Sequence, residues 1–355
     1  MNKQQLREDA THYYLTVLGG LEDIAAAEVT ERLPQAHLLE QRYGRLFLRY
    51  GGPPRQLMAL RSIENIFAHL ADFDGLSPAE EGLEQVQRWA ETVPLDGALA
   101  TWTALHDAPD APSFRVSAQR LGHHEYNSQQ IAAAAGAGLC MATGWRVDLT
   151  GFDYEVMVEI EQERCLMGLR LSRRALHKRS RVTHGLAALN PTAAYAMCVL
   201  SDPTPDETVL DPMCGTATIL IERAALGPAT LIGSDAHPRA IEDARMNLQA
   251  AQVIASLLQA DARRLPLRTE SVDKLLCNLP WGRRVMSRGS LSYLYEGFVS
   301  EMTRVLRPGG KAVLLTTRSG LLVKLITRTH KLRLVHERVI RLGGAKPHLF
   351  IVRRS

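Results

Sequence analysis

The hydrophobic and polar pattern along the chain predicts two kinds of architecture, which meet near residue 190. Residues 12–33 begin with an apolar strand, pass a Gly-Gly turn and continue with apolar positions near helical spacing. Residues 37–51 then give a strand, a turn and a second strand. This β-α-β-β order predicts a small α+β unit of the ferredoxin type over residues 1–62.

Residues 63–171 are expected to form a second α+β unit. A stretch rich in Asp, Pro, Gly and Ala surrounds one expected helix at Ala79–Val93, and PSFRVSAQR follows as a strand. The next helix is expected to begin at Ser128, which can cap it, and to run through Gly138 near its end. Two or three further strands are expected in residues 146–171.

From residue 190 onward, strands and helices alternate. The apolar runs TVLDP, TLIGSD, ASLLQAD, DKLLCN and KAVLLTT are mostly separated by helical segments of about 10–15 residues, which is typical of a parallel doubly wound sheet. Two final strands, at Leu332–Leu342 and in HLFIVRR, have no long helix between them. We expect them to form an antiparallel edge, which gives residues 190–355 an α/β, Rossmann-like fold with a seven-stranded sheet.

The composition narrows the class of protein. Of 355 residues, 46% are hydrophobic and 23% charged, which excludes a disordered, collagen-like or coiled-coil chain. No run approaches about 18 uninterrupted apolar residues and no secretory signal is evident, so we expect a cytoplasmic protein without a membrane span. The five cysteines show no CxxC spacing, so we expect reduced thiols and no metal site. They are Cys140, Cys165, Cys198, Cys214 and Cys277.

The net charge of +4 conceals an asymmetry. Residues 1–110 carry 9 Lys and Arg against 17 Asp and Glu, a charge of −8, which leaves +12 for the remainder. The excess of positive charge after residue 110 has two explanations. It faces a polyanionic partner, or it is a solvated surface of incidental charge. Six cations and one histidine without any acid gather around an expected linker at residues 172–189, and their mutual repulsion favours a hinge that contacts phosphates. They are Arg170, Arg173, Arg174, His177, Lys178, Arg179 and Arg181.

Polar residues follow the predicted parallel strands in register. The carboxyl ends of such strands share one crevice, and an acid after the second strand suits the two hydroxyls of a ribose. The loop after the first strand, DPMCGTAT, has neither a Walker lysine nor the GxGxxG fingerprint, which disfavours a phosphate-binding loop and NAD. We therefore expect a nucleoside cofactor. The strand-end residues are Asp211, Asp235, Asp261 and Asn278.

This pattern resembles class I S-adenosylmethionine-dependent methyltransferases, with Ala217 where many nucleotide loops have glycine. The resemblance implies that Asp211, Gly215 and Thr216 lie under the methionine moiety. It also implies that Asp235 holds the ribose and that Asp261 with Ala262 reads the adenine. The segment NPTAAYAM resembles the part of such enzymes that closes over the cofactor. The remaining cofactor contacts expected from the resemblance are Pro191, Thr192, Cys214, Ala236 and Asn278.

The tetrapeptide Asn278-Leu279-Pro280-Trp281 resembles the Asn/Asp-Pro-Pro-aromatic motif of amino-methyltransferases, with leucine in place of the commoner proline. An exocyclic base amine is a poor nucleophile because its lone pair is delocalised into the ring. The Asn278 amide oxygen and the Leu279 carbonyl are candidate acceptors for its N–H groups. Pro280 rigidifies the turn, and Trp281 offers a face on which a flipped base stacks, worth about 1–3 kcal/mol. Alternatively, the motif is a strand-end turn whose tryptophan fills the core.

Residues 113–171 resemble a THUMP domain, and SRRALHKRSR followed by HGLAALNPTAA resembles the junction between THUMP and methyltransferase domains in RNA guanine-N2 methyltransferases. The resemblance divides the chain into residues 1–62, a THUMP domain at 63–171, the linker at 172–189 and the catalytic domain at 190–355. It implies contacts to the phosphates of tRNA, for which His123 and His124 are further candidates. The expected RNA contacts are Arg115, Arg120, Arg173, Arg174, Lys178, Arg179, Arg181, Arg283 and Arg284.

Together these features predict a monomeric S-adenosylmethionine-dependent enzyme that methylates N2 of a guanosine in tRNA, near the acceptor stem at position 6. The tetrapeptide alone does not separate guanine N2 from adenine N6, and ribosomal RNA is an alternative substrate. A THUMP protein that binds RNA and has lost catalysis is a second alternative, which the intact Asn278 and Trp281 disfavour. The THUMP-like half disfavours a DNA amino-methyltransferase.

Overall fold

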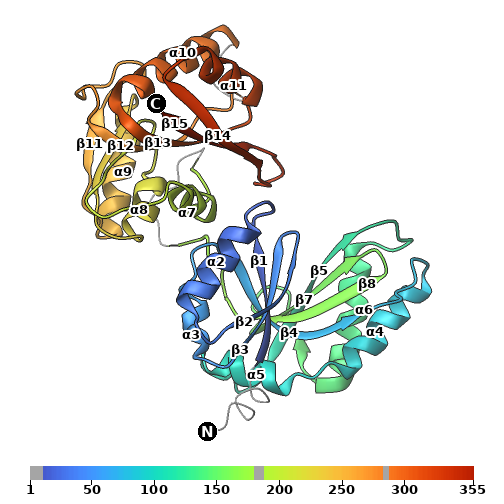
Figure 1. Cartoon of the computed structure of the whole chain (residues 1–355). Coiled ribbons are helices and arrows are strands. Elements are labelled where there is room, and N and C mark those ends of the chain that lie inside the picture. Colours follow the sequence, from blue (N-terminus) through green and yellow to red (C-terminus); the bar gives the residue numbers. More distant parts are fainter. Residues whose placement is uncertain (1–10, 180–187, 283–287) are drawn as a thin grey trace. The chain divides into compact units, whose positions relative to one another are not determined.

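The computed structural model describes residues 11–179, 188–282 and 288–355, and it divides the chain into two compact units. The division falls between Leu176 and His177, inside the linker predicted at residues 172–189; residues 18–25 group with the second unit. Each unit is built on one sheet (Figure 1). In the part of the chain that the structure describes, no helix has the length and apolar character needed to cross a bilayer.

The first unit contains an eight-stranded sheet in the order β2-β3-β1-β4-β8-β7-β5-β6. Strand β4 pairs antiparallel with both β1 and β8, so one sheet runs across the domain boundary predicted at residues 62 and 63. The strands are β1 (Thr11–Val17), β2 (His37–Arg42), β3 (Arg45–Tyr50), β4 (Ile63–Phe73), β5 (Ser113–Leu121), β6 (Arg146–Val147), β7 (Tyr154–Glu161) and β8 (Arg164–Arg170).

The helices of this unit correct one prediction. The single helix expected at Ala79–Val93 is followed by a second, because Val93 takes an extended conformation before Pro94, where a helical one is disfavoured. The helices are α2 (Glu22–Arg32), α3 (Pro54–Leu57), α4 (Glu81–Thr92), α5 (Asp96–Thr103) and α6 (Ser128–Thr143).

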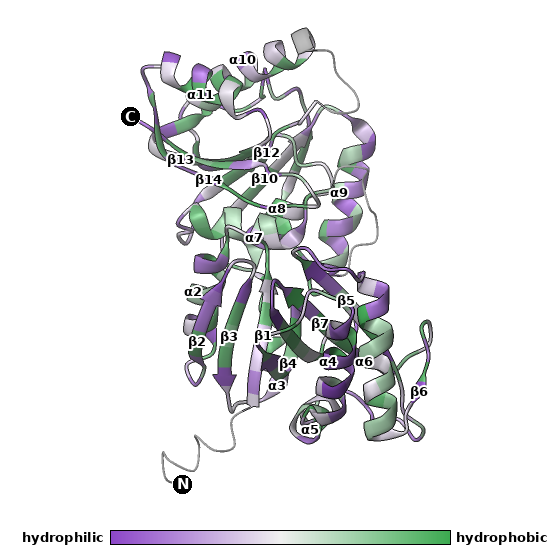
Figure 2. Ribbon diagram, turned by 90° about the vertical axis from the view of Figure 1, so that its right-hand side faces the viewer, coloured by the Kyte–Doolittle hydropathy of each residue, from purple (hydrophilic) through white to green (hydrophobic). Residues whose placement is uncertain are grey.

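Helix α6 begins and ends differently from the prediction. Asn127, not Ser128, is the N-cap: its side chain accepts from two backbone amides, and Gln130 closes the capping box. The helix continues past Gly138 to Thr143, and its C-cap is Gly144, which has a left-handed φ of 68°. Gly138 serves packing instead, because a Cβ there would lie 2.2 Å from the Gln87 carbonyl oxygen of α4. Figure 2 shows these helices beside one another.

The second unit contains the predicted seven-stranded sheet, in the order β11-β10-β9-β12-β13-β15-β14. The first five strands pair in parallel, whereas β15 pairs antiparallel with β13 and β14, which confirms the expected antiparallel edge. The strands are β9 (Thr208–Asp211), β10 (Thr230–Asp235), β11 (Ser256–Gln259), β12 (Val272–Asn278), β13 (Leu306–Thr316), β14 (Leu332–Val339) and β15 (His348–Arg354).

Helices and strands of the second unit enclose a large apolar core. One face of α10 contributes Leu291, Tyr295, Phe298 and Met302, which are buried at helical spacing against residues of β12 and β13. Thus α10 is fixed beside the end of β12. The helices are α7 (Pro191–Leu200), α8 (Thr218–Ala224), α9 (Pro238–Ala250), α10 (Arg288–Val305) and α11 (Ser319–Arg328).

The close approach of α4 and α6 gives a paired stability prediction. Gly138→Ala should lower the free energy of unfolding by about 1–3 kcal/mol, because the new methyl group meets backbone. Gly136→Ala should raise it by up to about 1 kcal/mol, because alanine favours helix and the nearest atom, Val116 Cγ2, lies 3.9 Å away. Denaturant titration by tryptophan fluorescence measures both changes. Equal effects of the two substitutions would contradict this account of Gly138.

Candidate cofactor and catalytic site

The loop that follows β9 places a buried carboxyl at the sheet edge. Asp211 is the last residue of β9 and is 1% exposed. Its Oδ1 accepts from the Met213 backbone N–H at 3.2 Å. Burial is the main cause that raises the pKa of Asp211 to about 8; the Met213 bond opposes this effect, and the charge of Asp235 adds a smaller increase. This carboxyl therefore holds a proton near neutral pH unless a cation arrives beside it.

The loop itself has a fixed conformation. Gly215 has a φ of 50° and Ala217 a φ of 62°, so two residues occupy the left-handed region before α8 begins. An alanine there costs about 1–2 kcal/mol, which the surroundings must offset. Asn247 of α9 contributes by donating from Nδ2 to the Thr216 carbonyl at 3.1 Å. Cys214 is a buried residue of the same loop, and burial raises the pKa of its thiol, so it is unreactive.

Asp235, at the end of β10, joins two backbone segments. One of its oxygens accepts from the Gly215 N–H at 3.1 Å, and the other accepts from the His237 N–H at 3.0 Å. A carboxylate has about four lone-pair sites, so acceptor capacity remains for the hydroxyls of a ribose. The neighbouring Ala236 is exposed.

Asp261 lies two residues beyond the end of β11 and has an ionic partner that the sequence prediction missed. The Arg263 guanidinium binds both carboxylate oxygens, with Nε at 3.0 Å from each, and this bond lowers the pKa of Asp261. The same guanidinium stacks over the Tyr293 ring of α10 at 4.8 Å. Ala262 beside it is buried. The expected adenine-reading acid is thus already held in place by Arg263.

Helix α7 begins at the segment expected to close over the cofactor. Asn190 caps it by accepting from the Thr192 N–H at 2.7 Å, and Pro191 occupies the first turn. Pro191 and Thr192 are both buried. Among the described residues, the Thr192 hydroxyl oxygen has no hydrogen-bond partner.

The tetrapeptide continues directly from β12, which lies between β9 and β13. The Asn278 amide oxygen is buried without a hydrogen-bond partner in the described chain, and so is the indole nitrogen of Trp281. Leu279 is fully buried, so its side chain serves the core, while Trp281 is only half-buried. The tryptophan is therefore not enclosed as a core residue, which disfavours the alternative of a simple strand-end turn.

These residues fit a nucleoside cofactor with a cationic amino acid tail. The ends of β10, β9 and β12 adjoin in the sheet, which brings Asp235, Asp211 and Asn278 to one edge. The unpartnered buried atoms of Thr192, Asn278 and Trp281 each favour a ligand group that would satisfy them, because a buried polar atom without a partner costs about 1–3 kcal/mol.

The structure separates the predicted RNA contacts into three groups. Arg115 is ion-paired to the buried Glu155 at 2.8 Å, and Arg179 is paired to the buried Glu222 at 3.2 Å, so both have structural partners. Four cations are exposed, namely Arg120, Arg173, Arg174 and Lys178. Arg181, Arg283 and Arg284 lie outside the described residues.

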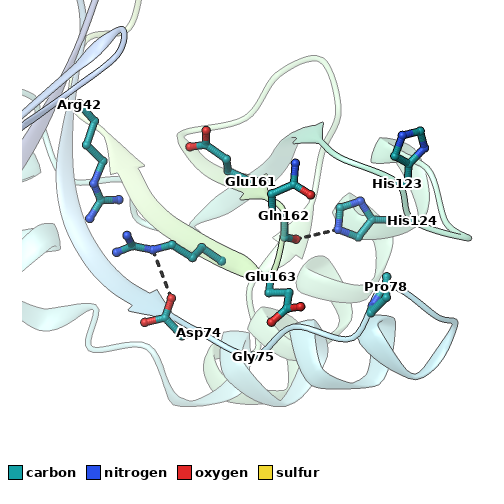
Figure 3. Close-up of a pocket in the computed structure, with 10 residues that line it drawn as sticks. Arg42, Asp74, Gly75, Pro78, His123, His124, Glu161, Gln162 and Glu163 are labelled. Carbon is teal, nitrogen blue, oxygen red and sulfur yellow. Dashed lines mark hydrogen bonds and ion pairs between the residues drawn. The ribbon is translucent and has the colours of Figure 1, made fainter.

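A hollow in the first unit includes the two histidines of the expected RNA surface (Figure 3). His123 is exposed, whereas His124 Nε2 lies 2.8 Å from the Gln162 carbonyl oxygen. Arg164 in the same hollow is ion-paired to Asp74 at 3.2 Å. Cations and acids both line the hollow, so it is not a uniformly basic site. The lining residues include Arg42, Asp74, His123, Glu161, Glu163 and Arg164.

Two family models match separate parts of the chain. Residues 97–170 match the model of the THUMP domain, and residues 178–348 match that of an RMKL-like methyltransferase domain. A tRNA (guanine(6)-N2)-methyltransferase of Thermus thermophilus is 31% identical over 94% of this chain and 97% of its own length. The mouse tRNA (guanine(6)-N(2))-methyltransferase THUMP3 is 32% identical over 70% of this chain, which spans 52% of that protein.

The crystal structure of TrmN from Thermus thermophilus has a TM-score of 0.82 and 30% identity, with 97% of this chain and 100% of that chain covered. The fold and the strand-end residues define a class I S-adenosylmethionine-dependent methyltransferase with a THUMP domain in its first half. Within that class, the chain belongs to the THUMP-containing guanine-N2 tRNA methyltransferase family.

The raised pKa of Asp211 predicts that cofactor binding releases a proton. A cationic cofactor beside this carboxyl stabilises its ionised form, so near pH 7 we expect close to one proton released per S-adenosylmethionine bound. Isothermal titration calorimetry in buffers of different ionisation enthalpy measures this number. Asp211→Asn should bring the number of protons released by the protein near zero. Any contribution from the ligand's own ammonium is the same for both proteins and cancels in the comparison. A binding enthalpy independent of buffer in the wild type would refute the prediction.

Proposed function

We propose that the protein transfers a methyl group from S-adenosylmethionine to N2 of a guanosine in tRNA, at position 6 of the acceptor stem. The observation that carries this proposal is the buried amide oxygen of Asn278 at the end of β12, which has no partner within residues 11–179, 188–282 and 288–355 and precedes the half-buried Trp281 by three residues. The guanine(6)-N2 activity named for the Thermus relative, which is similar over nearly the whole chain, supports the position.

The chemistry of an exocyclic amine explains these residue types. Its lone pair is delocalised into the ring, and two acceptors on its N–H groups draw the nitrogen towards tetrahedral geometry. The Asn278 amide oxygen supplies one acceptor, and the Leu279 main-chain carbonyl supplies the other. Because the second acceptor belongs to the backbone, leucine replaces the commoner proline without loss of the contact.

The remaining residues position the reactants. Trp281 offers a flat face to a base lifted out of its stack, a contact worth about 1–3 kcal/mol. The bound cofactor supplies an already activated methyl group, so the chain's contribution is mainly orientation. Asp211 and Asp235 hold the charged and hydroxylated parts of the cofactor. The rate of methyl transfer is therefore sensitive to small displacements of the tetrapeptide.

The exposed cations are proposed to contact phosphates. Arg120 lines the same hollow as His123 and His124 in the first unit. The other three, Arg173, Arg174 and Lys178, lie in the expected linker at residues 172–189. Arg115 and Arg179 are instead assigned structural roles, because each is ion-paired to a buried carboxylate. We propose that the enzyme works as a monomer in the cytoplasm.

Replacement of Asn278 tests the catalytic assignment. Asn278→Ala removes the acceptor and should reduce methyl transfer at least about 100-fold while leaving tRNA affinity within about twofold. Asn278→Asp retains acceptor oxygens and should keep measurable activity. Labelled methyl transfer to bulk tRNA and rRNA, followed by mapping of the labelled nucleoside, gives both rate and site. Full activity of Asn278→Ala would reject the mechanism, and label in adenosine or rRNA would reject the substrate.

Salt dependence tests the proposed RNA surface. Each phosphate neutralised by a cation contributes a slope of about −0.7 to −0.9 to the logarithm of affinity against the logarithm of salt concentration. The double substitution Arg174→Ala, Lys178→Ala should make that slope shallower by about 1–2. Fluorescence anisotropy of labelled tRNA measures it. A flat titration of the wild-type protein, or an unchanged slope in the double variant, would contradict the assignment.

A further inference from the structure

Two side chains from other elements bind the main chain of the tetrapeptide. Tyr295 of α10 donates from its hydroxyl to the Pro280 carbonyl at 3.0 Å. Arg318, which precedes α11, donates from Nε to the Trp281 carbonyl at 3.1 Å. Two consecutive carbonyls are therefore fixed by residues that lie 15 and 37 positions further along the chain.

Thr316 connects these two side chains. Its hydroxyl oxygen lies 2.6 Å from the Tyr295 hydroxyl and accepts from the Arg318 backbone N–H at 2.9 Å. A hydroxyl donates one hydrogen bond, and Tyr295 uses its proton on Pro280. The Thr316 hydroxyl must therefore donate to Tyr295, so the three residues form one directed chain of hydrogen bonds that ends on the tetrapeptide.

The environment holds this chain of bonds in place. Tyr295 and Thr316 are both fully buried, and burial raises the pKa of Tyr295 well above its usual value, which keeps its hydroxyl protonated as a donor. Gly282 has a φ of 73°, and a Cβ there would lie 2.8 Å from Leu291 and 3.1 Å from Arg318 Nη2. The left-handed φ favours glycine here, and a side chain would crowd the Arg318 guanidinium.

We propose that Tyr295 and Arg318 are positioning residues for methyl transfer, which set the backbone of the tetrapeptide so that the Leu279 carbonyl and the Asn278 amide oxygen meet the target amine. The geometry assigns this role because the two side chains bind the carbonyls of Pro280 and Trp281, which directly follow Leu279 in the chain. This inference rests on the proposed function, since it names what aligns the two acceptors.

A tyrosine that only packed in the core would not affect the alignment of the two acceptors. Removal of its hydroxyl would change stability alone, whereas release of the Pro280 carbonyl here lets the second acceptor move. Such movement weakens the alignment in the transition state and leaves the proposed phosphate contacts of the exposed cations unchanged. The expected signature is a lower kcat with little change in KM for tRNA.

Tyr295→Phe is the decisive variant, because it removes one oxygen from a buried ring. We expect kcat to fall at least about tenfold, which corresponds to about 1.4 kcal/mol, with KM for tRNA and Kd for S-adenosylmethionine within about twofold. Arg318→Lys keeps the positive charge but loses the Nε donor, and it should show the same pattern. Tyr126→Phe is the matched control, because the Tyr126 hydroxyl also donates to a backbone carbonyl, that of Ser77 at 2.7 Å, in the first unit.

Thermal unfolding of all three variants separates positioning from stability. The proposal holds if Tyr295→Phe and Tyr126→Phe lower Tm by similar amounts and only the former lowers kcat. Unchanged kcat in Tyr295→Phe, or an equal loss in Tyr126→Phe, overturns it, as does a loss confined to cofactor or tRNA affinity. Rates are measured on whichever RNA nucleoside the wild type methylates. A different substrate would refute the proposed function, but the ratio of kcat between variant and wild type would still be measurable and would test this inference.

Discussion

The amide oxygen of Asn278 is buried without a partner among the described residues, and the arrangement of the second unit maintains it in that state. Such an atom costs about 1–3 kcal/mol, so it persists only where neighbouring structure prevents its relaxation. Strand β12 is paired on both sides, by β9 and β13, and the Leu279 N–H donates to the Leu315 carbonyl at 2.9 Å. The acceptor therefore stands at a fixed strand end and not on a mobile loop.

Much of the second unit was predictable because local pattern and topology agree there. Short apolar runs between helices predict parallel strands, and the absence of a long helix before HLFIVRR correctly predicts the antiparallel edge. The ends of these strands in turn predict where Asp211, Asp235 and Asn278 lie. The pattern does not indicate which atom each side chain contacts. Tyr295 occupies an apolar helical face, so its spacing indicates only a core residue and not a hydroxyl that reaches Pro280.

The first unit was harder to predict because its decisive pairings are distant in sequence. Strand β4 pairs with β8, about a hundred residues away, and no local signal indicates that this pairing joins two expected domains into one sheet. Gly138 gave a misleading signal, because a glycine near the end of a helix suggests termination, whereas this one permits close packing with α4. Charge counts were similarly ambiguous. They cannot distinguish Arg115, which neutralises Glu155, from an exposed cation such as Arg174.

On the proposed function, the burial of Asp211 links folding stability to cofactor binding. Its pKa of about 8 in the fold lies above the 3.8 of a free carboxyl, so the folded protein binds this proton more tightly than the unfolded chain does. The stability that this proton contributes is complete below about pH 4 and is lost as the pH rises through about 8. A cationic cofactor offsets that loss by stabilising the ionised carboxylate, and a ligand that binds only the folded state adds its own stabilisation. On the proposed function, a methyl donor bound beside Asp211 thus offsets a cost that burial of this carboxyl imposes on the fold near neutral pH.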